Sequence, residues 1–430
     1  MADIPGRLKL ILLFIIGSML VMFIDGLVFD NYNSRESMAM MHMDMKPVIY
    51  ADPAPPSQKD YWEKFHLWPT DESDPDTPLE PEILIENGKE IKFYRIVADN
   101  VLHELRAGVK RPMFSFNNQI PAPTLRLQEG DHVRVEFYNN ATEPHTIHWH
   151  GINNIKNEHD GVPDVTQEPV LPGETFIYEF IAEPSGTKAY HCHVDAPHHI
   201  NMGMFGAIII DPKNETVTAD REYTLILTEF DKKHAHVGYP GEMMPMGPDG
   251  PLPWLITPGR KFMMPFKPKI DEFLINGKSF PYTKPLVVKE GEWVRIRFVN
   301  MGSMPHSIHI HGHEYKVTHR DGFELPEPFH TDTLLIGSGE RYDAWFEANN
   351  PGLWIMHDHG GLGVTAGGYD PAGMLAAIAY EGHETEFFTQ FLERAHVYTE
   401  NIEHMDDDHG RLTPATDLGG HGMEMGEGGH

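Results

Sequence analysis

Four pairs of histidines, each pair separated by one residue, stand out in this 430-residue chain. Alternate residues of a β-strand point to the same face, so the two histidines of each pair would project from one side of a sheet. Imidazole is a suitable ligand for copper, and eight such rings would suffice for a cluster of several ions. One pair alone is commonly solvated, whereas four pairs favour a metal site. The pairs are His148 with His150, His191 with His193, His309 with His311, and His357 with His359.

A second group of candidate ligands surrounds Cys192, the only cysteine in the chain. His199 and Met204 follow it, and His145 lies upstream on another predicted strand. Two histidines, one thiolate and a weak axial methionine form the trigonal site of a blue copper centre. A lone cysteine is otherwise a small buried hydrophobe, and the flanking histidines make that interpretation the weaker one.

The chain contains an internal repeat. Residues 129–150 correspond to residues 290–311 with an offset of 161, and the later histidine pair is repeated as well. Two domains of similar plan are therefore expected, one after the other.

Short runs of alternating polar and apolar residues predict the strands that carry these ligands. Residues 91–96 and 132–137 are examples, and Gly, Pro and Asn interrupt such runs at short intervals. This pattern is typical of antiparallel β-sandwiches. The sequence thus predicts an all-β fold with one domain over residues 83–212 and a second over residues 213–382.

The N-terminal segment has the pattern of an exported chain. Residues 10–24 are uncharged and mostly apolar, and they follow Arg7 and Lys9. We expect residues 1–30 to be either an uncleaved membrane anchor or a signal peptide, with the anchor favoured because no clear cleavage site follows. The basic N-terminal side places the rest of the chain outside the cytoplasm in both cases.

Two further segments flank the β domains. Residues 31–82 are rich in Pro, Asp, Glu and Met, which predicts a flexible tether. Residues 383–430 are predicted to form a helix, over about 384–402, and a tail rich in His and Met. The methionines of residues 38–45 and of this tail could capture or deliver copper, since thioethers select Cu(I), or they could belong to plain spacers.

The net charge of the chain restricts the kinds of molecule that it can bind. The chain has 34 Lys and Arg against 64 Asp and Glu, for a formal charge of −30. This balance argues against nucleic acid, whose binding needs basic side chains for the phosphates. It would favour a cationic electron donor, such as a metal ion or a basic redox protein, without identifying one.

Several motifs together resemble those of laccase-like multicopper oxidases. The resemblance covers residues 83–382 and implies two cupredoxin domains, which are Greek-key β-sandwiches. It further implies that electrons pass one at a time from a blue copper site to a trinuclear copper cluster, where dioxygen is reduced to water. The motifs that carry it are residues 145–151, 160–163, 165–167, 171–176 and 191–193.

The resemblance also assigns a role to each ligand. The type 1 copper would be bound by His145, Cys192, His199 and Met204, with His198 as the adjacent competitor of His199. The type 2 copper would be bound by His148 and His309. The type 3 pair would be bound by His150, His191, His193, His311, His357 and His359. The donor pocket would lie beside His199, the ligand most often exposed in this family.

The second repeat departs from this pattern. Asp358 stands at the position of Cys192, so no blue site is predicted there although His306 and Met374 are retained. The chain therefore resembles a two-domain oxidase with type 1 copper in its first domain only. Such a chain leaves complementary edges of its domains open. The resemblance implies a homotrimer with four coppers per chain, in which each trinuclear cluster is shared between two neighbouring subunits.

Two carboxylates are candidates for proton transfer during dioxygen reduction. Asp160 lies in an Asp-Gly-Val-Pro turn and Asp195 lies just after His193, and both are similar to acidic positions near the cluster in the family. The alternative is a turn-forming aspartate and a solvated one.

Two other functions remain to be weighed. A copper nitrite reductase, which produces nitric oxide, has a related fold and trimeric assembly, but it would leave several of the paired histidines, including His193, without a role. A membrane-tethered copper store or electron carrier would explain the Met-rich segments but not a full set of cluster ligands.

Overall fold

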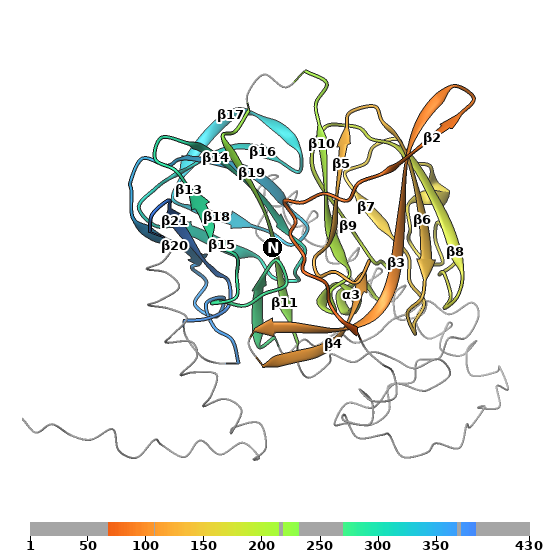
Figure 1. The fold of residues 1–430 in the computed structure, drawn as a ribbon, viewed down its shortest axis with the longest axis horizontal. Helices are drawn as coiled ribbons and strands as arrows, with labels where there is room; N and C mark the ends of the chain where they lie inside the picture. The colour runs from red at the N-terminus through yellow and green to blue at the C-terminus, as the bar shows by residue number, and fades with distance from the viewer. Residues whose placement is uncertain (1–67, 107, 215–217, 232–269, 368–370, 384–430) are drawn as a thin grey trace, which may run out of the picture. The chain divides into compact units, whose positions relative to one another are not determined.

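The computed structural model describes residues 68–106, 108–214, 218–231, 270–367 and 371–383. These residues form four β-sheets, two in the first half of the chain and two in the second. The two halves are called domain 1 and domain 2 below, and their strands lie side by side in Figure 1. The predicted all-β architecture of two tandem sandwiches is therefore found.

Domain 1 has a six-stranded and a four-stranded sheet. The first has the order β1-β3-β6-β8, with β2 and β4 also paired to β3, and the second has the order β5-β10-β9-β7. The strands are β1 (Trp68–Pro69), β2 (Glu82–Glu86), β3 (Lys89–Arg106), β4 (Val109–Phe116), β5 (Ala122–Gln128), β6 (His132–Asn139), β7 (His148–His150), β8 (Thr175–Ile181), β9 (Gly186–His191) and β10 (Phe205–Asp211). The short helices are η1 (Asn157–His159) and α3 (Ala196–Asn201).

Domain 2 repeats the plan with a six-stranded sheet, β12-β11-β14-β19-β16-β17, and a five-stranded sheet, β13-β21-β20-β15-β18. Its strands are β11 (Arg221–Phe230), β12 (Glu272–Ile275), β13 (Leu286–Val288), β14 (Trp293–Asn300), β15 (His306–Ile310), β16 (Tyr315–Arg320), β17 (Phe323–Thr331), β18 (Thr333–Ile336), β19 (Arg341–Glu347), β20 (Leu353–Asp358) and β21 (Leu375–Tyr380).

The alternating sequence pattern explains which side chains form the cores. In β6 every second residue is buried, from Val133 to Phe137, while the residues between them stay partly exposed. β15 shows the same alternation, with Ile308 and Ile310 in the core. The remaining positions of β15 are therefore free to carry His309 on the outer face.

Strand pairing brings the separate histidine pairs together. β7 is antiparallel to β9, so that His148 lies opposite His191. β15 is antiparallel to β20 in the same way, so that His309 lies opposite His357. Each domain thus assembles two histidine pairs from distant parts of its sequence on one sheet.

Ordered contacts begin before residue 83. β1, at Trp68–Pro69, pairs in parallel with β3, and Leu79 donates a backbone hydrogen bond to Thr124. The part of the predicted tether from residue 68 onward therefore packs on domain 1. The predicted anchor, the late helix and the Met-rich segments lie outside the described residues, and within the described ranges no helix is long and apolar enough to span a membrane.

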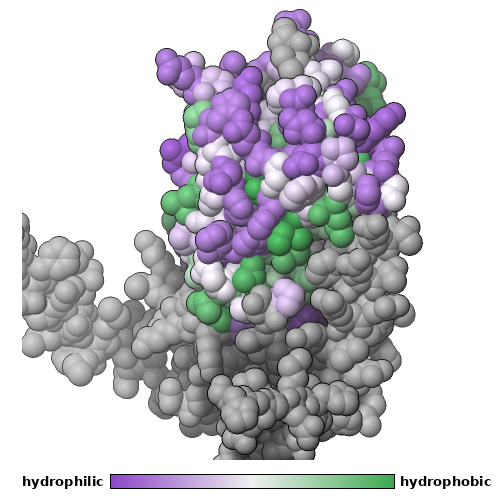
Figure 2. Space-filling model, turned by 90° about the vertical axis from the view of Figure 1, so that its left-hand side faces the viewer, coloured by the Kyte–Doolittle hydropathy of each residue, from purple (hydrophilic) through white to green (hydrophobic). Residues whose placement is uncertain are grey.

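The outer surface is largely polar on the face shown in Figure 2. Hydrophilic side chains cover most of its described upper part, and hydrophobic ones gather lower down. Polar cover of this kind is expected for a chain with a formal charge of −30.

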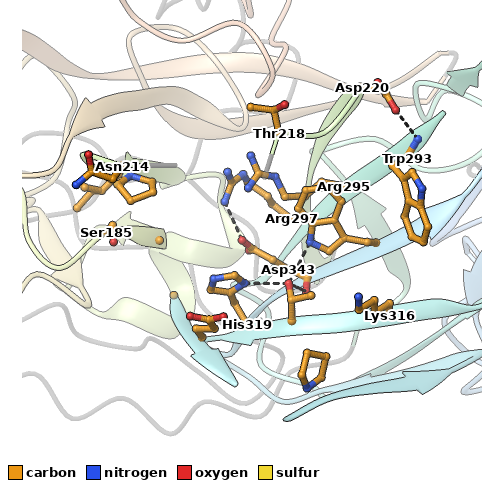
Figure 3. A pocket seen from close by; sticks show the side chains of 18 residues that line it. Ser185, Asn214, Thr218, Asp220, Trp293, Arg295, Arg297, Lys316, His319 and Asp343 are labelled. Atoms are coloured by element: carbon orange, nitrogen blue, oxygen red, sulfur yellow. Dashed lines mark hydrogen bonds and ion pairs between the residues drawn. The ribbon is translucent and has the colours of Figure 1, made fainter. Parts of the chain in front are cut away.

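A buried ionic network joins the two domains. Glu222 on β11 accepts hydrogen bonds from Arg126 of domain 1 at 3.0 Å and ion-pairs with Arg297 at 3.0 Å. Arg297 also donates to Asp343 at 2.9 Å and to the hydroxyl of Thr187, a domain 1 residue, at 2.7 Å. Arg297 and Asp343 point toward each other in a cleft of about 670 Å³ between the domains (Figure 3).

This network predicts how stability depends on pH. Burial raises the pKa of Glu222, but Arg297 and its neighbours outweigh burial and lower that pKa from 4.5 to about 2. A carboxylate with a depressed pKa stabilises the fold at pH values above its unfolded-state pKa, and this stabilisation is lost as the pH falls through its folded-state pKa. A pKa shift of this size corresponds to about 3 kcal/mol. Glu222→Gln should therefore lower the free energy of unfolding near pH 7 by about 3 kcal/mol, measured by urea titration.

The difference between wild type and Glu222→Gln should shrink as the pH falls from 4.5 toward 2. Glu86→Gln is the control, because Glu86 pairs with Arg134 at the surface and should change little. Equal losses for the two variants at neutral pH would contradict the assignment of Glu222 to the domain contact.

Candidate metal centre

Three side chains from distant segments meet in the core of domain 1. The Nδ1 atoms of His145 and His199 are 3.2 Å apart, and Cys192 Sγ lies 3.5 Å from the first and 3.2 Å from the second. All three side chains are completely buried. The structure therefore brings together three of the four residues predicted for the blue site as one set of potential metal donors.

Backbone hydrogen bonds hold this group in place. The amide of Cys192 donates to the carbonyl of Met204, and the amide of Met204 donates to the carbonyl of His199. His199 lies in α3, whose N-terminal turn is closed by the amides of His198 and His199 donating to the Asp195 carbonyl. Met204 is thereby kept next to Cys192 in the core, where its side chain is fully buried.

The donor set fits one copper ion. The three donor atoms form a triangle whose centre is about 2 Å from each of them, which is the length of a metal–ligand bond. Nε2 of His145 is buried without a hydrogen-bond partner among the described residues. The ring is therefore held by its packing against Phe114 and by the ligand that Nδ1 would bind. Two imidazoles and a thiolate in this arrangement match the ligand chemistry of blue copper.

Glu143 is a member of this site that the sequence did not reveal. Its carboxylate lies 3.2 Å from Nε2 of His199 and is largely buried. Burial lowers the pKa of His199, but Cys192 and Glu143 outweigh it and raise that pKa to about 10. The ring of His199 is fully buried, which corrects the expectation of an exposed ligand.

On the other side of the same strands, domain 1 gathers four histidine rings. His148, His150 and His191 form a second potential metal-binding group, with Nε2 of His150 and of His191 2.9 Å apart. His193 belongs to it through ring contacts with His148 and His191. All four histidines predicted for this half of the cluster are therefore together.

Domain 2 gathers its four histidines in the same way. Nε2 of His311 and of His357 are 3.1 Å apart, and His309 contacts the rings of His311, His357 and His359. A hollow of about 520 Å³ adjoins His309 and His311. The larger cleft between the domains contains none of the predicted copper ligands.

Hydrogen bonds to carbonyl groups orient these rings. Nδ1 of His148 donates to the Asp160 carbonyl at 2.7 Å, and Nδ1 of His191 donates to the Cys192 carbonyl at 2.7 Å. In domain 2, Nδ1 of His309 lies 2.9 Å from the Asp332 carbonyl and Nδ1 of His357 lies 3.0 Å from that of Asp358. Such contacts fix the tautomer and leave Nε2 of each ring for a metal.

The surroundings keep several of these rings neutral. Burial, followed by His148 and Arg341, lowers the pKa of His150 to about 3. Burial and neighbouring histidines also lower the pKa values of His191, His193 and His311. Metal binding requires the neutral imidazole, so these four rings are suited to it at neutral pH.

The two predicted proton-transfer residues lie in different places. Asp160 is beside His148, with its Oδ1 3.4 Å from Nδ1 of that ring. Asp195 caps α3, and burial, with a contribution from Glu143, raises its pKa. Asp160 thus adjoins the histidine half-site, whereas Asp195 adjoins the site of Cys192 and His199.

Comparison with known proteins shows the family. Two models of the multicopper oxidase family match residues 99–215 and 251–367. The solved blue copper oxidase of Nitrosomonas europaea is 39% identical, with a match that covers 68% of this chain and 87% of that chain at a TM-score of 0.59. The multicopper oxidase mgLAC is 38% identical with the same coverage and TM-score. The chain belongs to the multicopper oxidase family, whose cofactor is copper, and its domains are cupredoxin-like.

Curated relatives match over a shorter share of their length. Laccase-2 of Botryotinia fuckeliana is 33% identical over 258 residues, which are 59% of this chain and 43% of that protein. The chain spans about half or less of the curated relatives it matches. A copper nitrite reductase from Nitrosomonas europaea, 24% identical with a TM-score of 0.52, shares the fold.

The contact between Glu143 and His199 predicts a redox effect. Glu143→Gln keeps the shape of the side chain and removes its negative charge. That charge lies beside Nε2 of His199, a predicted type 1 ligand, and a nearby negative charge favours the oxidised, more positive copper ion. Loss of a charge-assisted hydrogen bond worth about 1 kcal/mol corresponds to a rise of roughly 40 mV in the one-electron potential. A redox titration of the blue absorption measures it.

The matched control is Asp160→Asn, which changes a carboxylate beside His148 and should leave the type 1 potential unchanged. An unchanged or lowered potential in Glu143→Gln would show that the carboxylate does not act on the metal through His199.

Proposed function

We propose that this protein couples the one-electron oxidation of a donor to the four-electron reduction of dioxygen to water. The observation that carries the proposal is the pair of histidine half-sites, four rings in each domain, together with the trigonal group around Cys192. When bound, type 1 copper would accept single electrons, and a cluster of type 2 and type 3 copper would reduce dioxygen. The ligand roles implied by the resemblance are proposed for these residues.

Cys192 would be the link between the two sites. Its side chain points to His145 and His199, while its backbone connects His191 and His193 of the half-site. The hydrogen bond from Nδ1 of His191 to the Cys192 carbonyl, at 2.7 Å, adds a second connection. The path of bonds from Cys192 to His191 and His193 would thus carry electrons over a short distance, in surroundings that exclude water.

Asp160 would assist proton transfer, because its carboxylate lies beside a predicted type 2 ligand. Asp195 would influence the donor side instead, since it is close to His199 and Glu143. We further propose that the protein works outside the cytoplasm, held by residues 1–30 or released after their cleavage. The physiological donor is not assigned.

We propose a homotrimer as the active assembly. Among the described residues, the ring contacts of each histidine half-site stay within its own domain, so that a full cluster needs a second half-site from a neighbour. Leu335 on β18 lies opposite Ser307 of β15, on the same outer face as His309. Its side chain is 61% exposed. An exposed apolar residue beside the histidines of domain 2 suits a contact between subunits.

Nitrite reduction is the weaker alternative. In that family the residue after the type 1 cysteine is not a ligand, whereas here His193 contacts His148 and His191. The likeness to the nitrite reductase concerns the fold alone. The paired histidines therefore favour dioxygen as the acceptor.

Oxygen uptake and nitric oxide release separate the two functions. The copper-loaded full-length protein, given an artificial electron donor, should consume dioxygen and, once oxygen is removed and nitrite is added, should release little nitric oxide. Cys192→Ser should lose the blue absorption and turnover while keeping cluster copper. His359→Ala should keep the blue absorption and lose cluster copper and turnover. Nitric oxide as the main product would overturn the proposal.

Subunit association should control the cluster. Leu335→Asp places a charge in the proposed contact, so the protein should sediment as monomers that hold blue copper and lack the type 2 signal in electron paramagnetic resonance. Ile85→Asp is a control at another apolar residue, 67% exposed, on β2, which belongs to the sheet of domain 1 that carries none of the paired histidines. A Leu335→Asp monomer that retained a complete cluster would contradict the shared site.

A further inference from the structure

Domain 2 contains a buried group of three charged side chains at the position of the blue site of domain 1. Nδ1 of His306 lies 2.8 Å from Oδ2 of Asp358, and Nε2 lies 2.7 Å from Oε1 of Glu229. The three residues are between 1% and 4% exposed. This group is called the acidic triad below.

The hydrogen-bond partners of His306 favour a positive charge on its ring. A carboxylate only accepts hydrogen bonds, and a neutral imidazole donates only one, so two carboxylates at both nitrogens require the imidazolium. Burial lowers the pKa of His306, but the hydrogen bonds to Asp358 and Glu229 outweigh it and raise that pKa to about 9. The triad therefore holds a cation between two anions.

The internal repeat shows which residues changed. His306 corresponds to His145, and Asp358 corresponds to Cys192. The registers of β3 with β6 and of β11 with β14 place Glu229 at the position of Asn100. Nδ1 of His145 faces the thiol and Nε2 has no described partner, whereas both nitrogens of His306 face carboxylates.

Glu229 keeps the role of its counterpart and adds a new one. The side-chain oxygen of Asn100 accepts the amide of Thr142 at 2.9 Å, and Glu229 accepts the amide of Ser303 at 2.8 Å, in the same turn of the other repeat. The longer side chain of Glu229 also reaches Nε2 of His306. One substitution thus supplies the second carboxylate without loss of the older contact.

Two glycines make room for the triad. A Cβ atom on Gly302 would collide with the carboxylate of Glu229, and domain 1 has Ala141 at the equivalent position. A Cβ atom on Gly363 would collide with the carboxylate of Asp358. Neither glycine has a positive φ, so the close approach of the carboxylates is the reason for them.

The triad is connected to the segments that carry the cluster histidines of domain 2. Oδ1 of Asp358 accepts the amides of Ser307 at 3.0 Å and Gly360 at 2.9 Å, and Asp358 lies between His357 and His359. The amide of His359 donates to the Ser307 carbonyl at 2.7 Å. The end of β20 and the start of β15 are therefore joined through this carboxylate as well as through the backbone pairing of the two strands.

We propose that Glu229, His306 and Asp358 are positioning residues that hold the cluster ligands of domain 2 without a metal, in place of the copper that ties the equivalent segments of domain 1. This inference rests on the proposed function, because it concerns the same cluster. In domain 1 backbone hydrogen bonds join β7 to β9 and Cys192 to Met204, but the side chains of His145, Cys192 and His199 meet as donor atoms that copper would join. In domain 2 hydrogen bonds and ion pairs make those connections, so its half-site would be preformed before copper enters.

Asp358→Asn tests the proposal, because it removes the charge of one arm and keeps the shape. The copper-loaded full-length protein is titrated with a copper chelator while the blue absorption and the type 2 signal in electron paramagnetic resonance are followed. We expect the type 2 signal to be lost at roughly 10- to 100-fold lower chelator concentration than in wild type. The blue absorption should fade at the same concentration in both proteins, which also shows that domain 1 is folded.

Gly363→Ala is a second variant that keeps every charge and displaces the carboxylate of Asp358, and it should have the same effect. Glu272→Gln is the matched control, since Glu272 is an equally buried carboxylate of domain 2 whose side chain pairs with Arg106 of domain 1. It should leave the type 2 signal unchanged.

The outcomes are separable. A wild type with blue absorption and no type 2 signal would overturn the proposed function itself. A wild type with a full cluster, combined with Asp358→Asn and Gly363→Ala proteins that release type 2 copper as wild type does, would overturn the positioning role alone. Equal weakening by Glu272→Gln would also overturn it, because the effect would then follow from any lost buried ion pair.

Discussion

The alternation of side chains along one short segment fixes both metal sites of domain 1. At residues 191–193 the two histidine rings lie on one side and stack with their centroids 5.8 Å apart, while the thiol between them is buried on the other side. His357 and His359 stack at the same distance and the same angle of 25°, with Asp358 buried between them. Because a strand has a period of two, a residue that approaches the core must separate two that face outward. The electron path, the half-sites and the acidic triad all depend on this geometry.

The same period explains why so much could be predicted from the sequence. Histidines two residues apart, repeated with an offset of 161, require strands that present both rings on one face. The partner strands then follow from the sandwich plan, which is why His148 lies opposite His191 and His309 opposite His357. The grouping of His145, Cys192 and His199 was predicted from the ligand types around the only cysteine, and the family resemblance then assigned their roles, while the turn at α3 that brings His199 to Cys192 was not predicted.

The residues that escaped prediction are those whose contacts depend on packing between distant elements. Glu143 is 56 residues from His199, and Glu229 is 77 residues from His306. Neither has a motif, because a carboxylate before a strand or at the end of one is ordinarily a surface residue. Only the difference between the repeats, with Glu229 in place of Asn100 and Gly302 in place of Ala141, carries a signal, and it becomes readable once strand registers are known.

Both domains meet the same electrostatic requirement in different ways. A buried anion needs a cation close to it, since desolvation would otherwise disfavour its charge strongly. In domain 1, Cys192 and Glu143 raise the pKa of His199 to about 10, so that without copper a proton on this ring supplies the positive charge. Copper must displace that proton, and its binding to the trigonal site is therefore coupled to proton release.

In domain 2 the anions are Asp358 and Glu229, and the cation is the imidazolium of His306. Because both of its ring nitrogens already face carboxylates, the proton stays on the ring, and a positive charge lies between the two anions without a metal. The repeat that has Asp358 in place of the cysteine thus has a half-site whose order depends on an ion triad, while the order of the other half-site depends on copper.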